Sequence, residues 1–249
     1  MQGGLRALFF VCAMIATHTH HTSDSRPKKT KSEINQWAAK ICGTLSKPSK
    51  MPCHGFSLPA QRCKTGGKLQ NDPNSTCFKC YALSGNYRRP NVRDALEARY
   101  QKLMHAHATG TLDVWAEAMA AQINANETSP FFRWHDSGDV QNVEHALAIF
   151  DVCERTPLFT HWLPTRELRF IREALEKRPK PRNLVIRLSA LRREFPPQAG
   201  LAKRLSIQTS TVSWTGSAHT CPAGKQGNVC GTCRACWSPT IENVDYPLH

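Results

Sequence analysis

Four cysteines fall within a short glycine-rich stretch near the C-terminus, and they constrain this chain more than any other feature. They are Cys221, Cys230, Cys233 and Cys236, of which the last three follow a C-x2-C-x2-C spacing. Thiolates at every third position of such a loop can point into one small volume, which suits a metal ion or a metal–sulfur cluster. Zinc sites more often use two separated C-x2-C pairs. The run therefore predicts a metal site and favours an iron–sulfur cluster over zinc, and either of these over disulfides.

A second group of four cysteines lies in the first third of the chain, with a C-x9-C-x13-C-x2-C spacing. Its members are Cys53, Cys63, Cys77 and Cys80. One C-x2-C pair with two scattered cysteines is also common in zinc ribbons, so zinc is the alternative here. The intervening residues 64–75 have turn chemistry and predict a loop. Eight of eleven cysteines in two such groups favour two metal sites in a reducing compartment, here the cytoplasm of a host cell.

The length and charge of the chain restrict the class of protein. A sequence of 249 residues with 40% hydrophobic and 21% charged residues is typical of one soluble globular domain. Lys and Arg number 33 against 19 Asp and Glu, which gives a net charge of +14. This excess favours nucleic acid, a nucleotide or another polyanion as partner, although a basic soluble enzyme would also fit.

The first fifty residues differ from the rest and predict a poorly structured or mis-started extension. An apolar run over residues 8–16 behind Arg6 has the outline of a signal peptide. We favour a mis-start or a dispensable tail over secretion, because thiolate ligands would be oxidised outside the cell. The run is too short to span a bilayer, so no transmembrane anchor is expected. A short helix follows Ser32. Residues 51–240 then form one domain, and 241–249 a tail.

Strand and helix patterns alternate through the body of the chain. Helices are expected within 91–126, interrupted at Gly110, and over 143–154, 165–177 and 201–205. Strands are expected over 56–58, 131–135, 158–164, 183–189 and 209–214. Such alternation predicts an α/β fold of parallel strands with right-handed crossovers, a partial or complete β/α barrel flanked by cysteine-rich metal-binding loops.

Polar side chains follow the predicted strands and would share one rim of that barrel, where β/α enzymes place their working groups. The rim residues are His135, Asp136, Asp139, Thr165, Arg166, Glu167 and Ser189. Of these, Asp136, Asp139 and Arg166 are the candidate catalytic residues. Each also has a structural interpretation, such as a helix cap, a turn or a surface ion pair.

Several motifs together resemble a known phage family. Met51-Pro-Cys53, Cys77-x2-Cys80-Tyr-Ala, the segment 133–139 (Arg-Trp-His-Asp-Ser-Gly-Asp) and the closing cysteine run ending in Trp237 are similar to the phage "gene product eighty-eight" domain. The similarity covers about residues 48–240. The family more distantly resembles radical S-adenosylmethionine enzymes.

The resemblance to radical enzymes implies a set of roles. Cys63, Cys77 and Cys80 would hold a [4Fe-4S] cluster and leave one iron open for S-adenosylmethionine. Ser137, Gly138 and Asp139 would lie beside the amino group of the cofactor, and Arg187 or Ser189 beside its carboxylate or ribose. The quartet from Cys221 would hold an auxiliary cluster. The chain departs from the usual C-x3-C-x2-C spacing, and Cys53 offers a fourth ligand that would close the first site.

Two functions follow as hypotheses. One is a phage or prophage iron–sulfur enzyme that uses S-adenosylmethionine to modify a nucleic acid or nucleotide. The other is a zinc-stabilised nucleic-acid-binding or structural phage protein without catalysis. No P-loop or dinucleotide-binding glycine fingerprint is present.

Overall fold

Six parallel strands in sequential order form the centre of the molecule. The structure is a computed structural model that describes residues 29–248, so the apolar run over residues 8–16 lies outside the described residues. The strands are β1 (Gly55–Phe56), β2 (Phe131–Trp134), β3 (Thr160–Thr165), β4 (Leu184–Ser189), β5 (Gln208–Val212) and β6 (Asn243–Tyr246). Each pairs in parallel with the next, which gives the order β1-β2-β3-β4-β5-β6.

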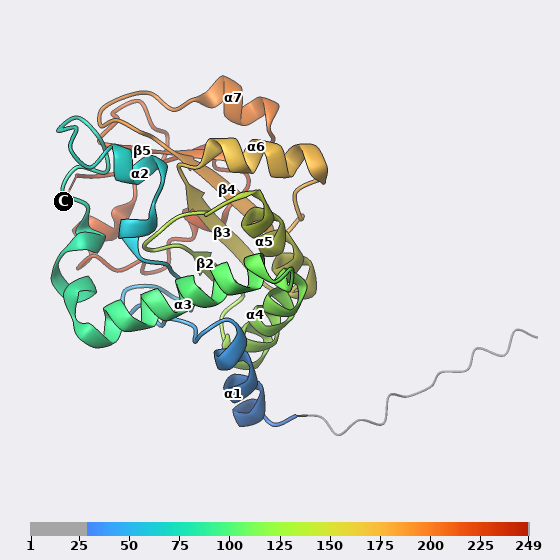
Figure 1. The fold of residues 1–249 in the computed structure, drawn as a ribbon. Coiled ribbons are helices and arrows are strands. Elements are labelled where there is room, and N and C mark those ends of the chain that lie inside the picture. Colours follow the sequence, from blue (N-terminus) through green and yellow to red (C-terminus); the bar gives the residue numbers. More distant parts are fainter. Residues whose placement is uncertain (1–28, 249) are drawn as a thin grey trace, which may run out of the picture.

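Helices connect successive strands and lie outside the sheet (Figure 1). The long ones are α1 (Lys31–Ile41), α3 (Pro90–Ala108), α4 (Leu112–Asn126), α5 (Val143–Arg155) and α6 (Leu168–Lys177), and the short ones are α2 (Thr65–Lys68) and α7 (Ala199–Arg204). Gly110 separates α3 from α4 at a φ of +69°, a conformation that glycine adopts without strain. The break at this residue, the alternation and the parallel pairing were all predicted.

The two faces of the sheet have different neighbours. Phe132 and Trp134 of β2 point towards the helices and are fully buried in the main core, together with Trp115 of α4. Phe131 lies on the opposite face, where it packs beside Trp162 and Trp237. Because side chains alternate along a strand, β2 supplies both cores. The opposite face, called the inner face below, is covered by irregular segments that carry cysteines.

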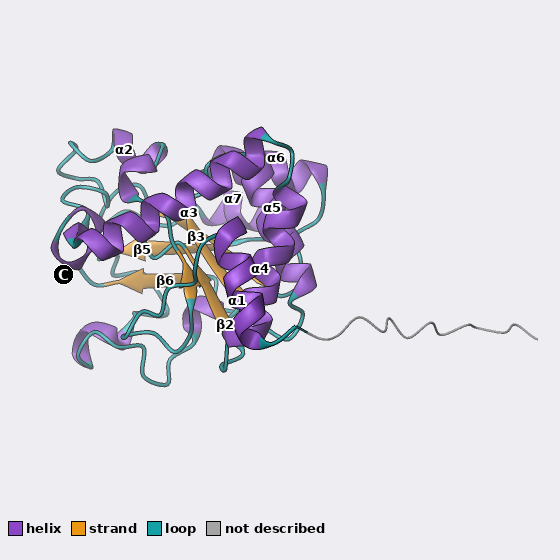
Figure 2. Ribbon diagram, turned by 60° about the horizontal axis from the view of Figure 1, so that its bottom comes forward, coloured by secondary structure: helices purple, strands orange, loops and turns teal. Residues whose placement is uncertain are grey.

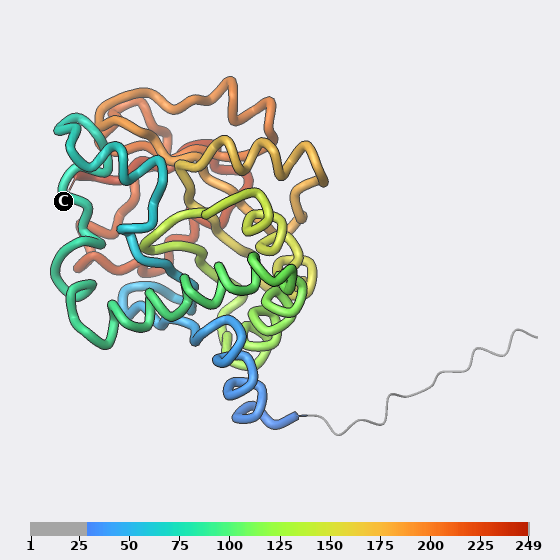
Figure 3. The backbone as a smooth tube through the Cα atoms, in the orientation of Figure 1, coloured from blue at the N-terminus to red at the C-terminus, as the bar shows by residue number. Residues whose placement is uncertain are grey.

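These irregular segments gather beyond the carboxyl ends of the strands, as the arrowheads of β5 and β6 show in Figure 2. The first lies between β1 and α3 and contains only α2 and short 3-10 turns at Ala60–Arg62, Tyr81–Leu83 and Gly85–Arg88. The second lies between β5 and β6 and contains only the turns Pro222–Lys225 and Ala235–Trp237. The backbone trace in Figure 3 shows how far both depart from the regular body.

Four sequence-based expectations need correction. The proposed extension over 1–50 includes α1, whose Ala38 is fully buried against the core, so ordered structure begins before residue 51. The proposed tail contains β6, whose short polar pattern carries no strand signal although Val244 is fully buried. The loop expected over 64–75 contains the single helical turn α2. In the described residues β1 and β6 are free edges, so a complete barrel is not formed.

Candidate metal centre

Three cysteines of the first group lie above the carboxyl ends of β2, β3 and β4. Cys63 follows the turn Ala60–Arg62, Cys77 is buried, and Cys80 precedes the turn Tyr81–Leu83. Gly66 of α2 separates the first two: a Cβ atom at this position would lie 3.2 Å from Cys77 Sγ and 3.3 Å from Cys63 Cβ. The absence of a side chain at residue 66 therefore leaves a cradle between the two thiols.

Loop residues after β3 hold this cysteine segment in place. The Glu167 carboxylate accepts hydrogen bonds from the backbone N–H of Lys64 (3.2 Å) and Thr65 (2.7 Å) and from the Thr65 hydroxyl (2.8 Å). Arg166 donates from Nε and Nη2 to Thr76 Oγ1, at 3.2 and 3.0 Å. Both flanks of the Cys63–Cys77 segment are thus tied to the end of one central strand.

The loop after β4 provides a second attachment. Thr76 donates from its hydroxyl to the Ala190 carbonyl (2.7 Å) and from its N–H to the Leu191 carbonyl (3.0 Å). Ser75 and Arg192 also form a short antiparallel bridge. The first cysteine group is consequently fixed at the position where parallel β/α folds place ligands.

Asp139 connects the strand ends beneath these cysteines. Its carboxylate accepts from the Thr165 hydroxyl (2.6 Å) and from the N–H groups of Val140 (2.8 Å) and Arg166 (2.9 Å). Burial outweighs these hydrogen bonds and raises the pKa of Asp139 to about 6. The carboxylate therefore organises the rim, and its acceptor sites are largely occupied by the protein itself.

The electrostatic environment of the thiols shows that the three cysteines influence one another. Burial raises the pKa of Cys63, and the neighbouring Asp139, Cys80 and Cys77 raise it further, while Arg166 lowers it. Burial likewise raises the pKa of Cys77, opposed chiefly by Arg166. Thiols in such surroundings stay protonated at neutral pH unless a cation compensates the thiolate charge, so the donor set suits a bound metal.

Other predicted cofactor-binding residues have different roles in the structure. The Ser137 hydroxyl donates to the Leu58 carbonyl at 2.8 Å, and Gly138, at a φ of +75°, lies so close to Leu58 that a Cβ would be 2.6 Å from it. Arg187 is fully buried and donates to four backbone carbonyls, those of Thr209, Ala235, Cys236 and Ser238. We correct the prediction for Arg187, because its guanidinium holds the turn before β6 and does not reach the rim.

Ser189 and Asp136 remain near the strand ends. Ser189 lines a pocket of about 210 Å³ with Arg192, Phe195 and Ser210. Asp136 accepts a hydrogen bond on Oδ2 from the Tyr87 hydroxyl at 2.8 Å, and its carbonyl accepts one from the Tyr81 hydroxyl. Residue patterns did not indicate Tyr87 as a partner, because it lies in a segment without a motif.

The second cysteine group lies on the inner face, and Cys53 belongs with it. Cys230 donates its N–H to the Lys50 carbonyl at 3.0 Å, which brings the segment ending in Cys53 against it. Cys53 is buried in the small core beside Trp162 and Trp237. The sequence-based assignment of Cys53 to the first group therefore differs from its position in the structure. Spacing could not reveal this, because the partner of Cys53 is far away in the chain.

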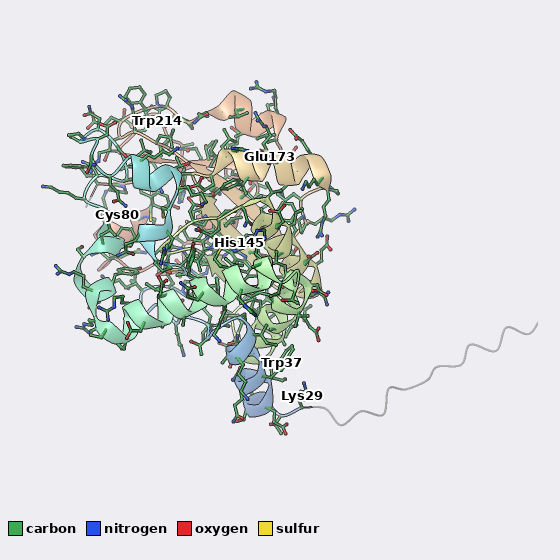
Figure 4. The ribbon with its side chains drawn as sticks, viewed as in Figure 1. Lys29, Trp37, Cys80, His145, Glu173 and Trp214 are labelled. Carbon is green, nitrogen blue, oxygen red and sulfur yellow. The ribbon has the colours of Figure 1, made fainter. Side chains whose placement is uncertain are left out.

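All ten cysteines of the described residues are free thiols. Among residues 29–248, no three His, Cys, Asp or Glu side chains are arranged closely enough to form a metal-binding group. Figure 4 shows Cys80 in the outer loop, well separated from His145 in the body of the molecule. The cysteines of each group thus lie on neighbouring segments, and their sulfur atoms would have to move closer together to share one ion.

Comparison with known proteins identifies the family. A family model described as Gene product 88 matches residues 20–239, so the chain belongs to this phage gene-product family. Neither the comparison with curated proteins nor that with solved structures gave a match. Within the described residues, no helix has both the length and the apolar character needed to cross a membrane.

Proposed function

We propose that this chain is a phage iron–sulfur protein whose first cysteine group holds an open cluster, and that it acts as a radical-S-adenosylmethionine-like enzyme. The observation that carries the proposal is that Cys63, Cys77 and Cys80 form a set of three at the carboxyl ends of the central strands, while Cys53 lies elsewhere. Three protein ligands leave one metal position open for chemistry, whereas four close it.

The arrangement of the strands also supports this function. Six parallel strands in sequential order, with helices outside, are what an incomplete β/α barrel requires, and the cysteines follow its first strand. When bound, a [4Fe-4S] cluster would supply an electron to the sulfonium of S-adenosylmethionine. The residues of this chain would hold the cluster through three thiolates and, through Arg166 and Glu167, keep the cysteine segment at the strand ends.

The cofactor assignment is narrower than the sequence alone implied. Arg187 is engaged with backbone carbonyls, so Ser189 and the pocket that it lines are the candidates for contact with S-adenosylmethionine. Arg166 offers the nearest positive charge to Cys77. Asp136 and Asp139 act by positioning the loops unless ligand binding releases their hydrogen bonds.

The test is metal content and visible absorbance of protein purified without oxygen. We expect brown protein with iron and sulfide, and loss of part of the iron in each of the variants Cys63→Ala, Cys77→Ala and Cys80→Ala. Cys42→Ala is the matched control, since Cys42 is buried in the helical core, where its thiol contacts backbone carbonyls and Gln122. On reduction, the wild type should cleave S-adenosylmethionine. Colourless protein that contains only zinc would exclude the proposal.

Exposed basic residues near the first group favour a nucleic acid as substrate, and also carry the alternative of a zinc-stabilised nucleic-acid-binding protein. Tyr81 is 60% exposed beside the exposed Lys79, and Arg88 and Arg89 are exposed a few residues further on. An exposed aromatic ring among cations suits a single-stranded nucleic acid, whose bases stack and whose phosphates pair with the charges.

Fluorescence anisotropy with a labelled single-stranded oligonucleotide tests this contact. The double variant R88A/R89A should weaken binding and reduce the salt slope by about two, roughly one for each lost phosphate contact. The control is R169A/R172A, because both of these exposed arginines already pair with Glu173 and Glu176 on α6. Equal losses in the two double variants would indicate unspecific attraction by net charge, and no binding at low salt would exclude a nucleic-acid partner.

A further inference from the structure

The segment between β5 and β6 lacks the features that normally stabilise a fold. None of residues 213–234 is buried, and within this range the only regular structure is the short turn Pro222–Lys225. Ordering a chain costs conformational entropy at every residue, and long irregular connections within a compact domain are uncommon unless they serve a function. A bound group that cross-links the segment would offset this cost.

The cysteines of this segment are brought towards one another by contacts at both ends. Cys221 donates its N–H to the Asp245 carbonyl of β6 at 2.7 Å, and Cys230 donates to the Lys50 carbonyl at 3.0 Å. Cys233 Sγ lies 3.6 Å from His219 Nε2. The thiols also influence one another electrostatically: Cys221 and Cys233 each raise the pKa of Cys230, and Cys230 raises that of Cys53.

Cys236, the last cysteine of the run, is engaged differently. Its thiol lies 3.2 Å from the Tyr246 hydroxyl, and its carbonyl accepts a hydrogen bond from the buried Arg187 at 3.0 Å. Burial raises the pKa of the Cys236 thiol to about 11. These contacts fix Cys236 to the sheet as part of the small core.

A buried guanidinium beside these thiols lacks an anionic partner. Arg133 of β2 stacks over the Trp162 ring at 4.5 Å and donates from Nη1 to Met51 Sδ at 3.0 Å. Its Nε is buried without an acceptor, and no carboxylate in residues 29–248 forms an ion pair with it. Because an uncompensated buried charge is costly, this position calls for a negative group.

We infer that Cys53, Cys221, Cys230 and Cys233 are the ligands of a second, thiolate-bound metal centre on the inner face, and that Arg133 balances its negative charge. His219 is a positioning residue that orients Cys233. Cys53 crosses from the N-terminal half to complete this site in place of Cys236. The inference deepens the proposed function, since the departure of Cys53 is also what leaves the first group with three cysteines.

The test uses cobalt(II) as the metal probe on the reduced, metal-free full-length protein. Tetrahedral cobalt–thiolate sites have intense visible bands, and the bands report the number of thiolate ligands. To isolate the second site, the measurements are made in the variant C63A/C77A/C80A, with circular dichroism to check that it folds. The second site should bind cobalt in this background even if the first group holds nothing, so failure of the proposed function would not affect the result.

We expect Cys53→Ser to lose the four-thiolate spectrum and Cys236→Ser to retain it. The reverse result, or equal spectra in both variants, would overturn the assignment. Arg133→Gln should weaken cobalt binding about tenfold, whereas Arg133→Lys, which keeps the charge, should weaken it less. Unchanged binding in Arg133→Gln would remove Arg133 from the proposal.

Limited proteolysis provides a readout that does not depend on colour. Cobalt should protect residues 213–234 from cleavage in the protein with Cys53, and should give no protection in Cys53→Ser. Protection that persists without Cys53 would contradict its role as a ligand. Metal analysis and the visible spectrum of protein purified without oxygen then distinguish a natural iron–sulfur cluster from zinc at the same thiolates.

Discussion

The helical half of the molecule and the segment 213–234 obtain their structure in different ways. In the helical half, Trp115, Phe132 and Trp134 are fully buried and contact one another or their neighbours edge to face. In 213–234 no residue is buried at all. Apolar burial is the main stabilising contribution to a fold. The first region therefore carries its stability in its own side chains, and the second depends on what its thiols bind.

The largest difference should appear when a large side chain is removed from each region. Trp134→Ala should lower the free energy of unfolding by about 3–5 kcal/mol, because it leaves a cavity and removes the hydrogen bond from Trp134 Nε1 to His161 Nδ1 (3.2 Å). Val229→Ala in the cysteine segment should lower it by less than about 0.5 kcal/mol. Urea denaturation of the two variants measures both values, and similar losses would disprove the contrast.

The second largest effect should come from the residue that joins the regions. Arg187→Met roughly preserves volume but leaves four carbonyl acceptors unsatisfied, so we expect a loss of about 3 kcal/mol. Cleavage between residues 213 and 242 should also become faster. Arg187→Lys should recover only part of the stability, since one ammonium group cannot reach all four carbonyls. Full recovery by lysine would show that charge matters more than the hydrogen-bond geometry.

Acid should destabilise the helical half through its buried histidines. Burial lowers the pKa of His135 and of His161 to about 3, and it lowers that of His145 well below 6.5. The unfolded chain binds protons below pH 6.5 but these rings do not, so stability is complete above pH 6.5 and falls as the pH decreases towards 3. At pH 5 each ring should cost up to about 2 kcal/mol.

The variant His161→Gln tests this explanation. Its free energy of unfolding should fall less between pH 7 and pH 5 than that of the wild type, by the contribution of one proton. His105→Gln, at an exposed position on α3, is the control and should leave the pH dependence unchanged. If His161→Gln has the wild-type slope, other groups determine the acid response.

The smallest effect should be found on the surface of the helical half. Arg169 pairs with Glu173 one turn further along α6 at 2.8 Å, and both groups meet solvent. Water and salt screen such pairs. Arg169→Ala should therefore leave the urea midpoint unchanged within error, and a clear loss would mean that α6 depends on its charges as well as on its apolar face.

Much of the central fold could be predicted because its signals are local. The apolar runs of β2 and β4 and the helix pattern broken at Gly110 follow directly from residue order. β6 could not be found in this way, because Asn243-Val-Asp-Tyr246 becomes a strand only through pairing with β5. Closure of a barrel is likewise a matter of long-range pairing, which periodicity does not encode.

The candidate site was predicted in part for the same reason. Residue types and spacing indicated the cysteines as candidate metal ligands, and the strand ends identified Asp139 and Arg166 as rim residues. Spacing could not divide the cysteines between two places. That division depends on the contact between Lys50 and Cys230, which are separated by most of the domain. Nor could it show that Arg187 is occupied by the turn at residues 235–238.

The anchoring of that turn also bears on how the protein matures. Arg187 fixes residues 235–238 from one side, and the bond between Cys221 and Asp245 fixes the other end of the thiol-bearing span. Neither contact involves an inorganic group. A newly synthesised chain can therefore finish its sheet first and receive its metal afterwards, which would allow the virus to rely on the assembly machinery of its host and on whatever supply the infected cell holds.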